Sequence, residues 1–232
     1  MKIIAHIENS YEEKFGVSRQ SGLAEHVLSR IVFEPEYRVP AAFRGLEEYS
    51  HLWLLWCFSA NEAAGWSPTV RPPVLGGNKR MGVFATRSPF RPNQIGLSSV
   101  RLVRVVCEGP EAPYLEVAGA DLLDGTPVYD VKPYLPYTDA HPEAAAGFSE
   151  AGARRLLSVH IPAELASVPD EQTYKAIYRI LQLDPRPSYQ KDSSRIYGMS
   201  YGGYDIKFTV TDKDLFVKYI GSGKQEKPWE KE

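Results

Sequence analysis

A stretch rich in Gly, Pro, aromatic and cationic residues in the middle of the chain has the residue types that bind anionic ligands. Between Glu62 and Glu108 there are seven Lys and Arg residues and no acidic residue, whereas the whole chain has 27 Lys and Arg against 29 Asp and Glu. Grouping like charges costs self-repulsion, so it commonly serves a polyanion such as nucleic acid or a phosphorylated ligand. The alternative is a solvated basic face with acidic partners from elsewhere in the fold.

Two of these cations, Arg87 and Arg91, lie four residues apart in the Pro-containing sequence RSPFRPN. A guanidinium group binds phosphate through two parallel hydrogen bonds and also stacks on bases, so this sequence suits a nucleotide ligand. A structural alternative has Arg87 buried in an ion pair and Arg91 exposed to solvent.

Carboxylates occur further along, in the sequence DLLDGTPVYDVKPYLPY at residues 121–137. The Asp124-Gly125 pair is first of all a turn signal, which would explain that carboxylate without any chemistry. Asp130, Lys132 and Tyr134 add a carboxylate, an ammonium group and a phenol in a part of the chain where Pro suppresses helix.

Several common catalytic signatures are absent from the sequence. It has no dinucleotide-binding glycine fingerprint, no phosphate loop and no Gly-x-Ser-x-Gly elbow. The five His residues have no partners at metal-ligand spacing, so we expect no metal site, and His51 is more typical of a core histidine than of a catalyst. Two isolated Cys residues and the lack of a signal peptide or a membrane-length apolar run favour a cytoplasmic protein.

The residues named above must be positioned by a strand-rich scaffold. Short runs of β-branched and aromatic residues alternate with Gly and Pro turns, which predicts a β-barrel or sandwich rather than a doubly wound sheet. The run at residues 53–56 is apolar on both faces, which predicts a central strand buried twice. The predicted strands cover residues 2–7, 31–33, 52–58, 81–86, 100–107, 114–118 and 128–131.

A second domain is predicted after this barrel domain, which we place at residues 1–138. Residues 139–155 are rich in Ala, Gly, Pro and Glu and are interpreted as a linker. Residues 156–221 predict a small α+β domain, with an amphipathic helix that begins near Pro169, then a hairpin and a last strand. Residues 222–232 are predicted to be a polar tail.

Five stretches of the chain, in this order, together resemble the tRNA N6-threonylcarbamoyladenosine methyltransferases. They are YEEKFGVSR, FRGLEEYSHLW, GWSPTVRPPVLGGNKRMGVFATRSPFRPN, DLLDGTPVYDVKPYLPY and DPRPSY. The third and fourth of these stretches are long and specific, and the last one, DPRPSY, resembles the bacterial two-domain form of the family.

This resemblance implies a mainly β, α+β protein whose N-terminal β-barrel binds S-adenosylmethionine, outside the Rossmann class of methyltransferases. It also implies a homodimer whose substrate is tRNA, with the methyl group added to N6 of a threonylcarbamoyladenosine 3′ to the anticodon. Three alternatives stay open: a non-catalytic RNA-binding barrel, a methyltransferase of the same fold with another substrate, and a hydrolase of a phosphorylated small molecule.

The resemblance further implies which residues bind the cofactor. Ser18, Ser21 and Gln94 stand where the family commonly has Pro, which removes ring constraints from two loops. The implied cofactor-binding residues are Gln20, Ser21, Gly22, Ser59, Ala60, Arg87, Leu97, Asp124, Gly125, Thr126 and Pro127.

Methyl transfer to N6 requires an aligned nucleophile and benefits from a base that removes the N6 proton, because the N6 lone pair is delocalised. We predict Asp124 as that base, with Asp130 as the second choice and His51 as a weaker candidate. The predicted tRNA-binding residues are Lys79, Arg80 and Arg91, together with Arg87, Lys132 and Tyr134. The second domain is expected to help bind tRNA through Arg179, Arg186, Lys191 and Arg195.

Overall fold

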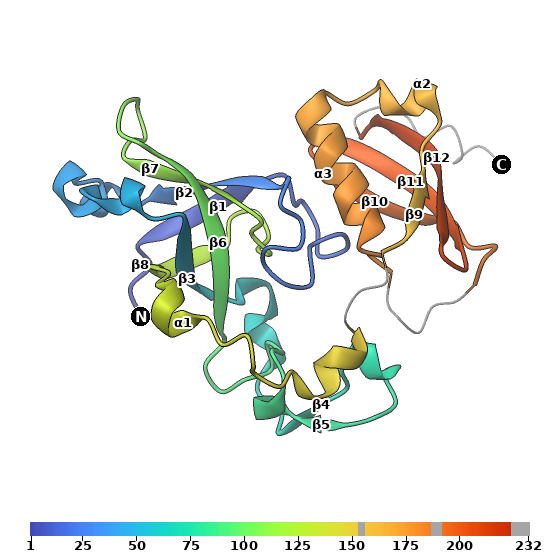
Figure 1. Ribbon diagram of the computed structural model, residues 1–232, viewed down its shortest axis with the longest axis horizontal. Coiled ribbons are helices and arrows are strands. Elements are labelled where there is room, and N and C mark those ends of the chain that lie inside the picture. The colour runs from blue at the N-terminus through green and yellow to red at the C-terminus, as the bar shows by residue number, and fades with distance from the viewer. Residues whose placement is uncertain (153–155, 187–191, 224–232) are drawn as a thin grey trace.

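The structure is a computed structural model that describes residues 1–152, 156–186 and 192–223. Its first part is a closed barrel in the strand order β1-β2-β7-β6-β3-β8, with all neighbours antiparallel (Figure 1). Pairing of Ala5 on β1 with Val128 on β8 closes the ring. The strands are β1 (Ala5–Asn9), β2 (Leu28–Phe33), β3 (His51–Cys57), β6 (Ile95–Val106), β7 (Tyr114–Ala118) and β8 (Pro127–Pro133). The predicted mainly β fold with an N-terminal barrel is confirmed.

Strand β3 shows how the apolar pattern fills the barrel. Leu52, Leu54 and Trp56 are buried in the barrel core, whereas Trp53 and Leu55 are only half-buried on the outer side. The prediction that this strand is buried on both faces is therefore wrong. Its outer face is only partly covered by helix α1 (Pro136–Asp139), where Trp53 Nε1 donates a 2.8 Å hydrogen bond to an Asp139 carboxylate oxygen.

A two-stranded ribbon of β4 (Thr69–Val70) and β5 (Met81–Gly82) extends from the barrel in the lower part of Figure 1. The strand predicted at residues 81–86 is therefore too long, because a 3-10 turn at Val83–Ala85 follows β5. The Thr86 hydroxyl donates to the Val83 carbonyl and closes this turn. Further short 3-10 helices lie at Pro35–Tyr37, Pro40–Phe43, Leu46–Glu48, Ser59–Ala64, Pro73–Leu75 and Gly147–Gly152.

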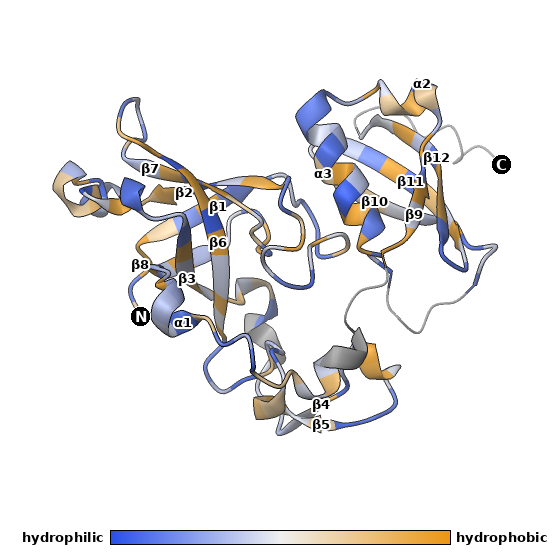
Figure 2. Ribbon diagram, in the orientation of Figure 1, coloured by the Kyte–Doolittle hydropathy of each residue, from blue (hydrophilic) through white to orange (hydrophobic). Residues whose placement is uncertain are grey.

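The second part of the chain is a four-stranded sheet covered by helices, which confirms the predicted α+β character. Its strand order is β10-β11-β12-β9, and β9 runs parallel to β12. Figure 2 shows hydrophilic and hydrophobic stretches alternating along α3. The elements are β9 (Ser158–His160), α2 (Ala163–Ala166), α3 (Glu171–Gln182), β10 (Tyr197–Tyr201), β11 (Tyr204–Thr211) and β12 (Asp214–Ser222).

Helix α3 begins and packs as its sequence requires. The Asp170 carboxylate accepts 3.0 Å hydrogen bonds from the backbone N–H groups of Gln172 and Thr173, which are free at a helix start. On the face of α3 that packs against the sheet, Ile177 and Leu181 are fully buried. None of the helices in the described parts of the chain has the length and apolar character needed to cross a membrane.

The hydrophobic core of the second domain includes residues from the barrel part of the chain. Tyr11, Ala24 and Val27, which come from residues 10–27 between β1 and β2, are buried in the same cluster as α3 and the second sheet. The same short segment therefore packs against the second domain on one side and against the barrel on the other.

Candidate functional site

A cavity of about 530 Å³ lies at the end of the barrel where β3 ends and β6 begins. Its walls come from segments that are distant in the sequence: residues 14–20, 53–61, 86–97 and 121–126. This volume lies within the roughly 300–1,000 Å³ of small-molecule sites, so the cavity is large enough for a nucleoside-sized ligand.

One wall of the cavity is aromatic. The ring centroids of Trp56 and Phe58 are 4.2 Å apart, and Trp56 is only 6% exposed. Gly96, which faces Trp56 across the β3–β6 pair, makes this packing possible, because a Cβ atom at that position would overlap the indole ring. An aromatic wall of this kind can stack on a purine base.

A buried polar chain runs from that wall to a carboxylate. Trp56 Nε1 donates a 2.9 Å hydrogen bond to Ser98 Oγ, and Ser98 Oγ donates a 2.5 Å hydrogen bond to Asp121 Oδ1. Burial raises the pKa of Asp121, although hydrogen bonds from Ser98 and from the Ser21 backbone and the charge of Arg87 act in the opposite direction. Asp121 therefore holds its proton to a higher pH than an exposed aspartate does.

Four cationic side chains, Lys14, Arg19, Arg87 and Arg91, also line the cavity. Arg87 is exposed and donates to the side-chain carbonyl of Gln20. Arg91 is half-buried, and its Nη1 donates to the carbonyls of Val83 (3.1 Å) and Thr86 (2.7 Å). The two arginines thus have the reverse of the exposures that the structural alternative predicted.

A second hollow of about 400 Å³ lies beside the first and shares Trp53, Arg87 and Leu97 with it. Arg87 therefore contacts both spaces and can interact with ligands in either one. The remaining lining residues of this hollow are Ser21, His51, Ser99, Tyr134 and Asp139.

The structure brings most of the predicted cofactor residues together. Ser21 lines the second hollow, whereas Gly22, Asp124, Gly125 and Pro127 are not among the residues that line either space. The predicted residues in the main cavity are Gln20, Ser59, Ala60, Arg87, Leu97 and Thr126.

Both predicted bases lie outside the cavity lining. Asp124 Oδ1 accepts a 2.9 Å hydrogen bond from the backbone N–H of Asn9, so this carboxylate connects the turn to β1. Asp130 pairs with Lys132 at 2.8 Å on β8. His51 is exposed at the start of β3 instead of lying in the core, and its ring contacts Tyr134 in the second hollow with centroids 6.2 Å apart.

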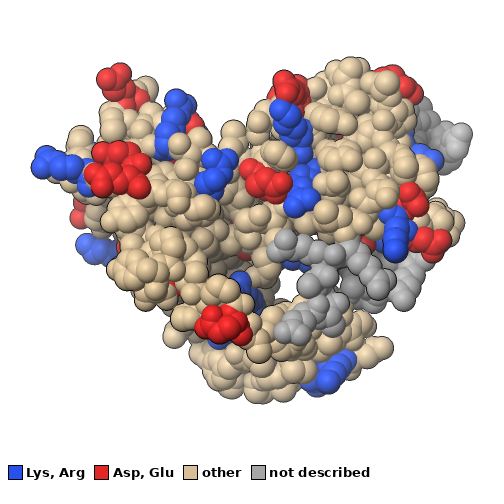
Figure 3. All heavy atoms as spheres, viewed as in Figure 1, with Lys and Arg blue, Asp and Glu red and all other residues tan. Residues whose placement is uncertain are grey.

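The predicted tRNA-binding residues are more dispersed. Arg91 lines the main cavity and Tyr134 the second hollow, while Lys132 is 63% exposed outside both. Lys79 and Arg80 are exposed next to the β4–β5 ribbon, where Arg80 donates to the Thr69 hydroxyl. Figure 3, which has the orientation of Figure 1, shows Lys and Arg side chains scattered over both lobes, with acidic residues between them.

Not every cation of the basic region is available for a ligand. Arg104 forms two hydrogen bonds, of 2.7 and 2.8 Å, to the carboxylate of Glu116 on β7. The solvated-face interpretation thus describes Arg104, while ligand binding stays possible for the cavity arginines.

Most arginines expected to bind tRNA from the second domain have internal partners. Arg179 contacts the barrel domain, and Arg186, with 11% of its side chain exposed, pairs with Asp184. Arg195 is exposed and lies over the Tyr197 ring. Lys191 lies outside the described residues.

Trp56, Ser98 and Asp121, which form the polar chain at the cavity, were not among the site residues predicted from the sequence, and Asp124 was predicted as the base instead of Asp121. One signal was available for Ser98: it occupies an inward position of β6, between Gly96 and Val100, where the strand pattern calls for an apolar residue. A buried hydroxyl needs a partner, and that partner is Asp121. Within the described parts of the chain, no group of three or more His, Cys, Asp or Glu could hold a metal ion.

Comparisons with known proteins match both parts of the chain. A model of the tRNA-methyltransferase O N-terminal domain matches residues 6–140, and one of the TrmO C-terminal domain matches residues 156–222. A tRNA (adenine(37)-N6)-methyltransferase of Escherichia coli is 42% identical over 222 residues, covering 92% of this chain and 94% of that protein.

Two further matches come from Pseudomonas aeruginosa. A protein whose given name is that of an S-adenosylmethionine-dependent methyltransferase is 40% identical, covering 91% of this chain and 93% of its own length. A TrmO crystal structure superposes with a TM-score of 0.77 at 33% identity, covering 95% of this chain and 96% of that one.

Proposed function

The chain belongs to the tRNA-methyltransferase O family, and we propose that it transfers a methyl group from S-adenosylmethionine to N6 of adenosine 37 in the tRNA anticodon loop. The observation that supports this most directly is one cavity that combines an aromatic wall, cationic side chains and a half-buried carboxylate. The residues that line the cavity therefore fit the activity of the family.

The residues that line the cavity fit S-adenosylmethionine. Its volume suits a nucleoside-sized ligand, the Trp56 and Phe58 rings suit an adenine, and Arg19 and Arg87 suit a carboxylate. The cofactor supplies a methyl group made electrophilic by a sulfonium sulfur. We propose that Gln20, Ser59, Ala60, Arg87, Leu97 and Thr126 hold it, as the resemblance implied.

We propose Asp121 as the general base, in place of Asp124 or Asp130. Asp121 is the carboxylate that lines the cavity, and its raised pKa makes it a stronger base than an exposed aspartate. With both ligands bound, Asp121 would take the N6 proton while the methyl–nitrogen bond forms and the methyl–sulfur bond breaks, leaving the thioether as the product. Ser98 holds the carboxylate in place through its 2.5 Å hydrogen bond.

The substrate adenosine already carries a threonylcarbamoyl group in this proposal. The carbamoyl carbonyl draws electron density from N6, so the N6–H is more acidic than in adenosine, and a carboxylate can take the proton in concert with attack of N6 on the methyl group. Its threonyl carboxylate is an anion that Arg91 or Arg87 can bind bidentately at the cavity. An anticodon-loop base is accessible because it lies in a single-stranded region and can be unstacked.

We also propose that the chain acts as a homodimer in the cytoplasm, where tRNA is modified. Exposed apolar side chains near the site support a protein contact there: Phe84 is 72% and Leu97 55% exposed. Sedimentation velocity measures this directly, and a monomer at micromolar concentration would contradict it.

The deciding experiment is mass spectrometry of nucleosides from tRNA incubated with the purified protein and S-adenosylmethionine carrying an isotope-labelled methyl group. We expect one labelled methyl on threonylcarbamoyladenosine, and none on matched tRNA that lacks threonylcarbamoyl. Methylation of the unmodified adenosine alone would instead identify a methyltransferase with another substrate. Calorimetry separates the remaining alternative, since a non-catalytic RNA-binding barrel would give no heat with S-adenosylmethionine.

A further inference from the structure

Residues 21–23 of the barrel domain lie between the ligand spaces and the second domain, and each makes a different contact. Ser21 lines the second hollow, the Gly22 N–H donates 2.8 Å to the Gly119 carbonyl, and the Leu23 carbonyl accepts 2.9 Å from Arg179 Nε. One tripeptide thus borders the second hollow, the barrel wall and helix α3.

The contact with the barrel wall leaves little freedom for this tripeptide. Gly119 has a φ of +80°, and a Cβ atom built on it would lie 3.2 Å from Gly22 Cα. The two backbones are therefore packed directly against each other. A displacement of Leu23 must either pass to Ser21 or break the Gly22–Gly119 hydrogen bond.

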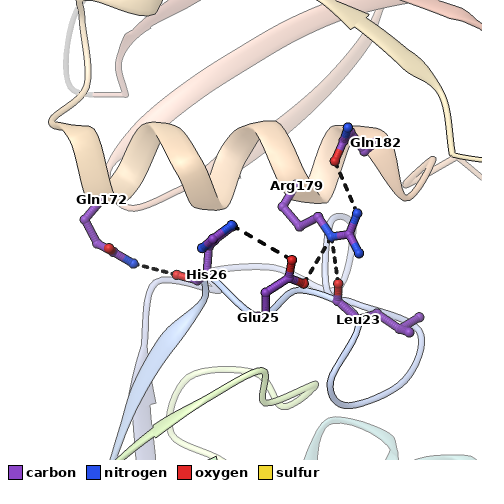
Figure 4. Close-up of polar contacts among 6 residues, drawn as sticks. All are labelled: Leu23, Glu25, His26, Gln172, Arg179 and Gln182. Carbon is purple, nitrogen blue, oxygen red and sulfur yellow. Dashed lines mark hydrogen bonds and ion pairs between the residues drawn. The ribbon is translucent and has the colours of Figure 1, made fainter. Parts of the chain in front are cut away.

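Arg179 is the main polar contact on the side of the second domain. Figure 4 shows its guanidinium group reaching from one end of α3 toward Leu23 and Glu25. Nε lies 3.2 Å from a Glu25 carboxylate oxygen, Nη1 donates to the Gln182 side chain at 3.2 Å, and only 19% of the side chain is exposed. At the other end of α3, Gln172 Nε2 donates 2.7 Å to the His26 carbonyl.

A second contact joins the same segment to the chain just after α3. Arg19, which lines the cavity, donates through Nη2 to the carbonyls of Asp184 (3.1 Å) and Arg186 (2.6 Å). Residues 19–26 are therefore held from the second domain at Arg19, Leu23 and His26, while their inner side borders the cavity.

We propose that Arg179 is a positioning residue through which the second domain holds residues 21–23 in the geometry that the methyl-donor cavity requires. This inference rests on the proposed function, since it concerns the S-adenosylmethionine site. Coupling between sites is reciprocal. Bound S-adenosylmethionine should therefore protect α3 from hydrogen exchange, although no residue of that helix is among those lining the two spaces.

The test compares Arg179→Ala with Lys175→Ala by calorimetry with S-adenosylmethionine. Lys175 is a matched control because it lies one turn away on α3 and pairs with Glu171 on the exposed face. We expect Arg179→Ala to raise the Kd and the KM for S-adenosylmethionine by roughly 5-fold or more, with kcat at saturating cofactor and the KM for tRNA nearly unchanged. Lys175→Ala should behave as wild type, and Arg179→Lys should recover part of the loss because an ammonium group can still donate to Leu23.

Hydrogen exchange of the cofactor-free protein provides a readout that does not depend on the proposed function. Exchange at residues 20–24 should be faster in Arg179→Ala than in Lys175→Ala. Wild-type Kd and wild-type exchange in Arg179→Ala would overturn the inference. If that variant fails to fold, Arg179→Met replaces it, because Met keeps a long side chain but cannot donate to the Leu23 carbonyl, and unchanged exchange there has the same meaning. No heat from wild type would refute the proposed cofactor, while the exchange result would still decide the inference.

Discussion

Asp121 and Asp124 lie three residues apart, yet their carboxylates have different surroundings. Asp121 accepts a hydrogen bond from Ser98 at 2.5 Å and lines the cavity, whereas Asp124 accepts the Asn9 backbone N–H at 2.9 Å and connects the turn to β1. Burial raises the pKa of the first of these groups. This contrast is the reason why we propose Asp121 for the proton transfer, while Asp124 holds the turn against β1.

Asp121→Asn tests the proton transfer. The amide keeps the shape of the side chain but cannot take a proton, so kcat should fall by about 10² to 10⁴-fold while the Kd for S-adenosylmethionine changes little. In the wild type, kcat should decrease as the pH falls through the raised pKa of Asp121, because the carboxyl group becomes protonated. Rapid-quench assays across pH measure both, with Asp124→Asn as the matched control. A larger loss of kcat in Asp124→Asn would return the role of base to the turn.

The same substitution, Asp121→Asn, should raise the stability of the fold although it lowers kcat. Because the pKa of Asp121 is raised in the folded state, this carboxyl adds stability at acid pH that is lost as the pH rises through that pKa. Asp121→Asn should therefore unfold at a higher temperature than the wild type near about pH 8, with the difference shrinking toward about pH 4. Differential scanning calorimetry in matched buffers measures this. A variant that is less stable at both pH values would show that the carboxylate stabilises the fold.

Gly96→Ala tests the packing of the aromatic wall. The added methyl group overlaps the Trp56 indole, which must move and lose its hydrogen bond to Ser98. We expect a loss of about 1–3 kcal/mol of unfolding free energy, together with weaker S-adenosylmethionine binding. Gly82→Ala is the control, since its Cβ atom meets nothing within 4 Å. Equal effects in urea denaturation would mean that the wall is not tightly packed.

Lys79→Ala tests whether the β4–β5 ribbon contacts the tRNA backbone. If Lys79 neutralises one phosphate, the plot of log K against log salt should become shallower by about one unit. Filter binding at several salt concentrations gives the slope, with Lys175→Ala as a control on α3. An unchanged slope would show that Lys79 does not contact a phosphate in the complex.

The sequence pattern was sufficient for the barrel and for several cavity residues, but it did not single out the carboxylate that we propose as the base. Alternating apolar residues and turn signals located strands such as Tyr114–Ala118 because these features are local. The Asp121–Ser98–Trp56 chain depends on contacts between segments that are distant in sequence, and two carboxylates three residues apart look equivalent until the fold places one of them at the cavity. The Arg179–Leu23 contact was missed for the same reason: 156 residues separate the partners.

The placement of Tyr11, Ala24 and Val27 in the core of the second domain has a practical consequence. A protein shortened to end near residue 140 would present these three apolar side chains to water and would tend to aggregate. Loss of tRNA affinity after such a truncation would then report damage to the barrel, so a single change at exposed Arg195 is the cleaner probe. By the same reasoning, a relative that consists of the barrel alone needs polar side chains at the three corresponding positions.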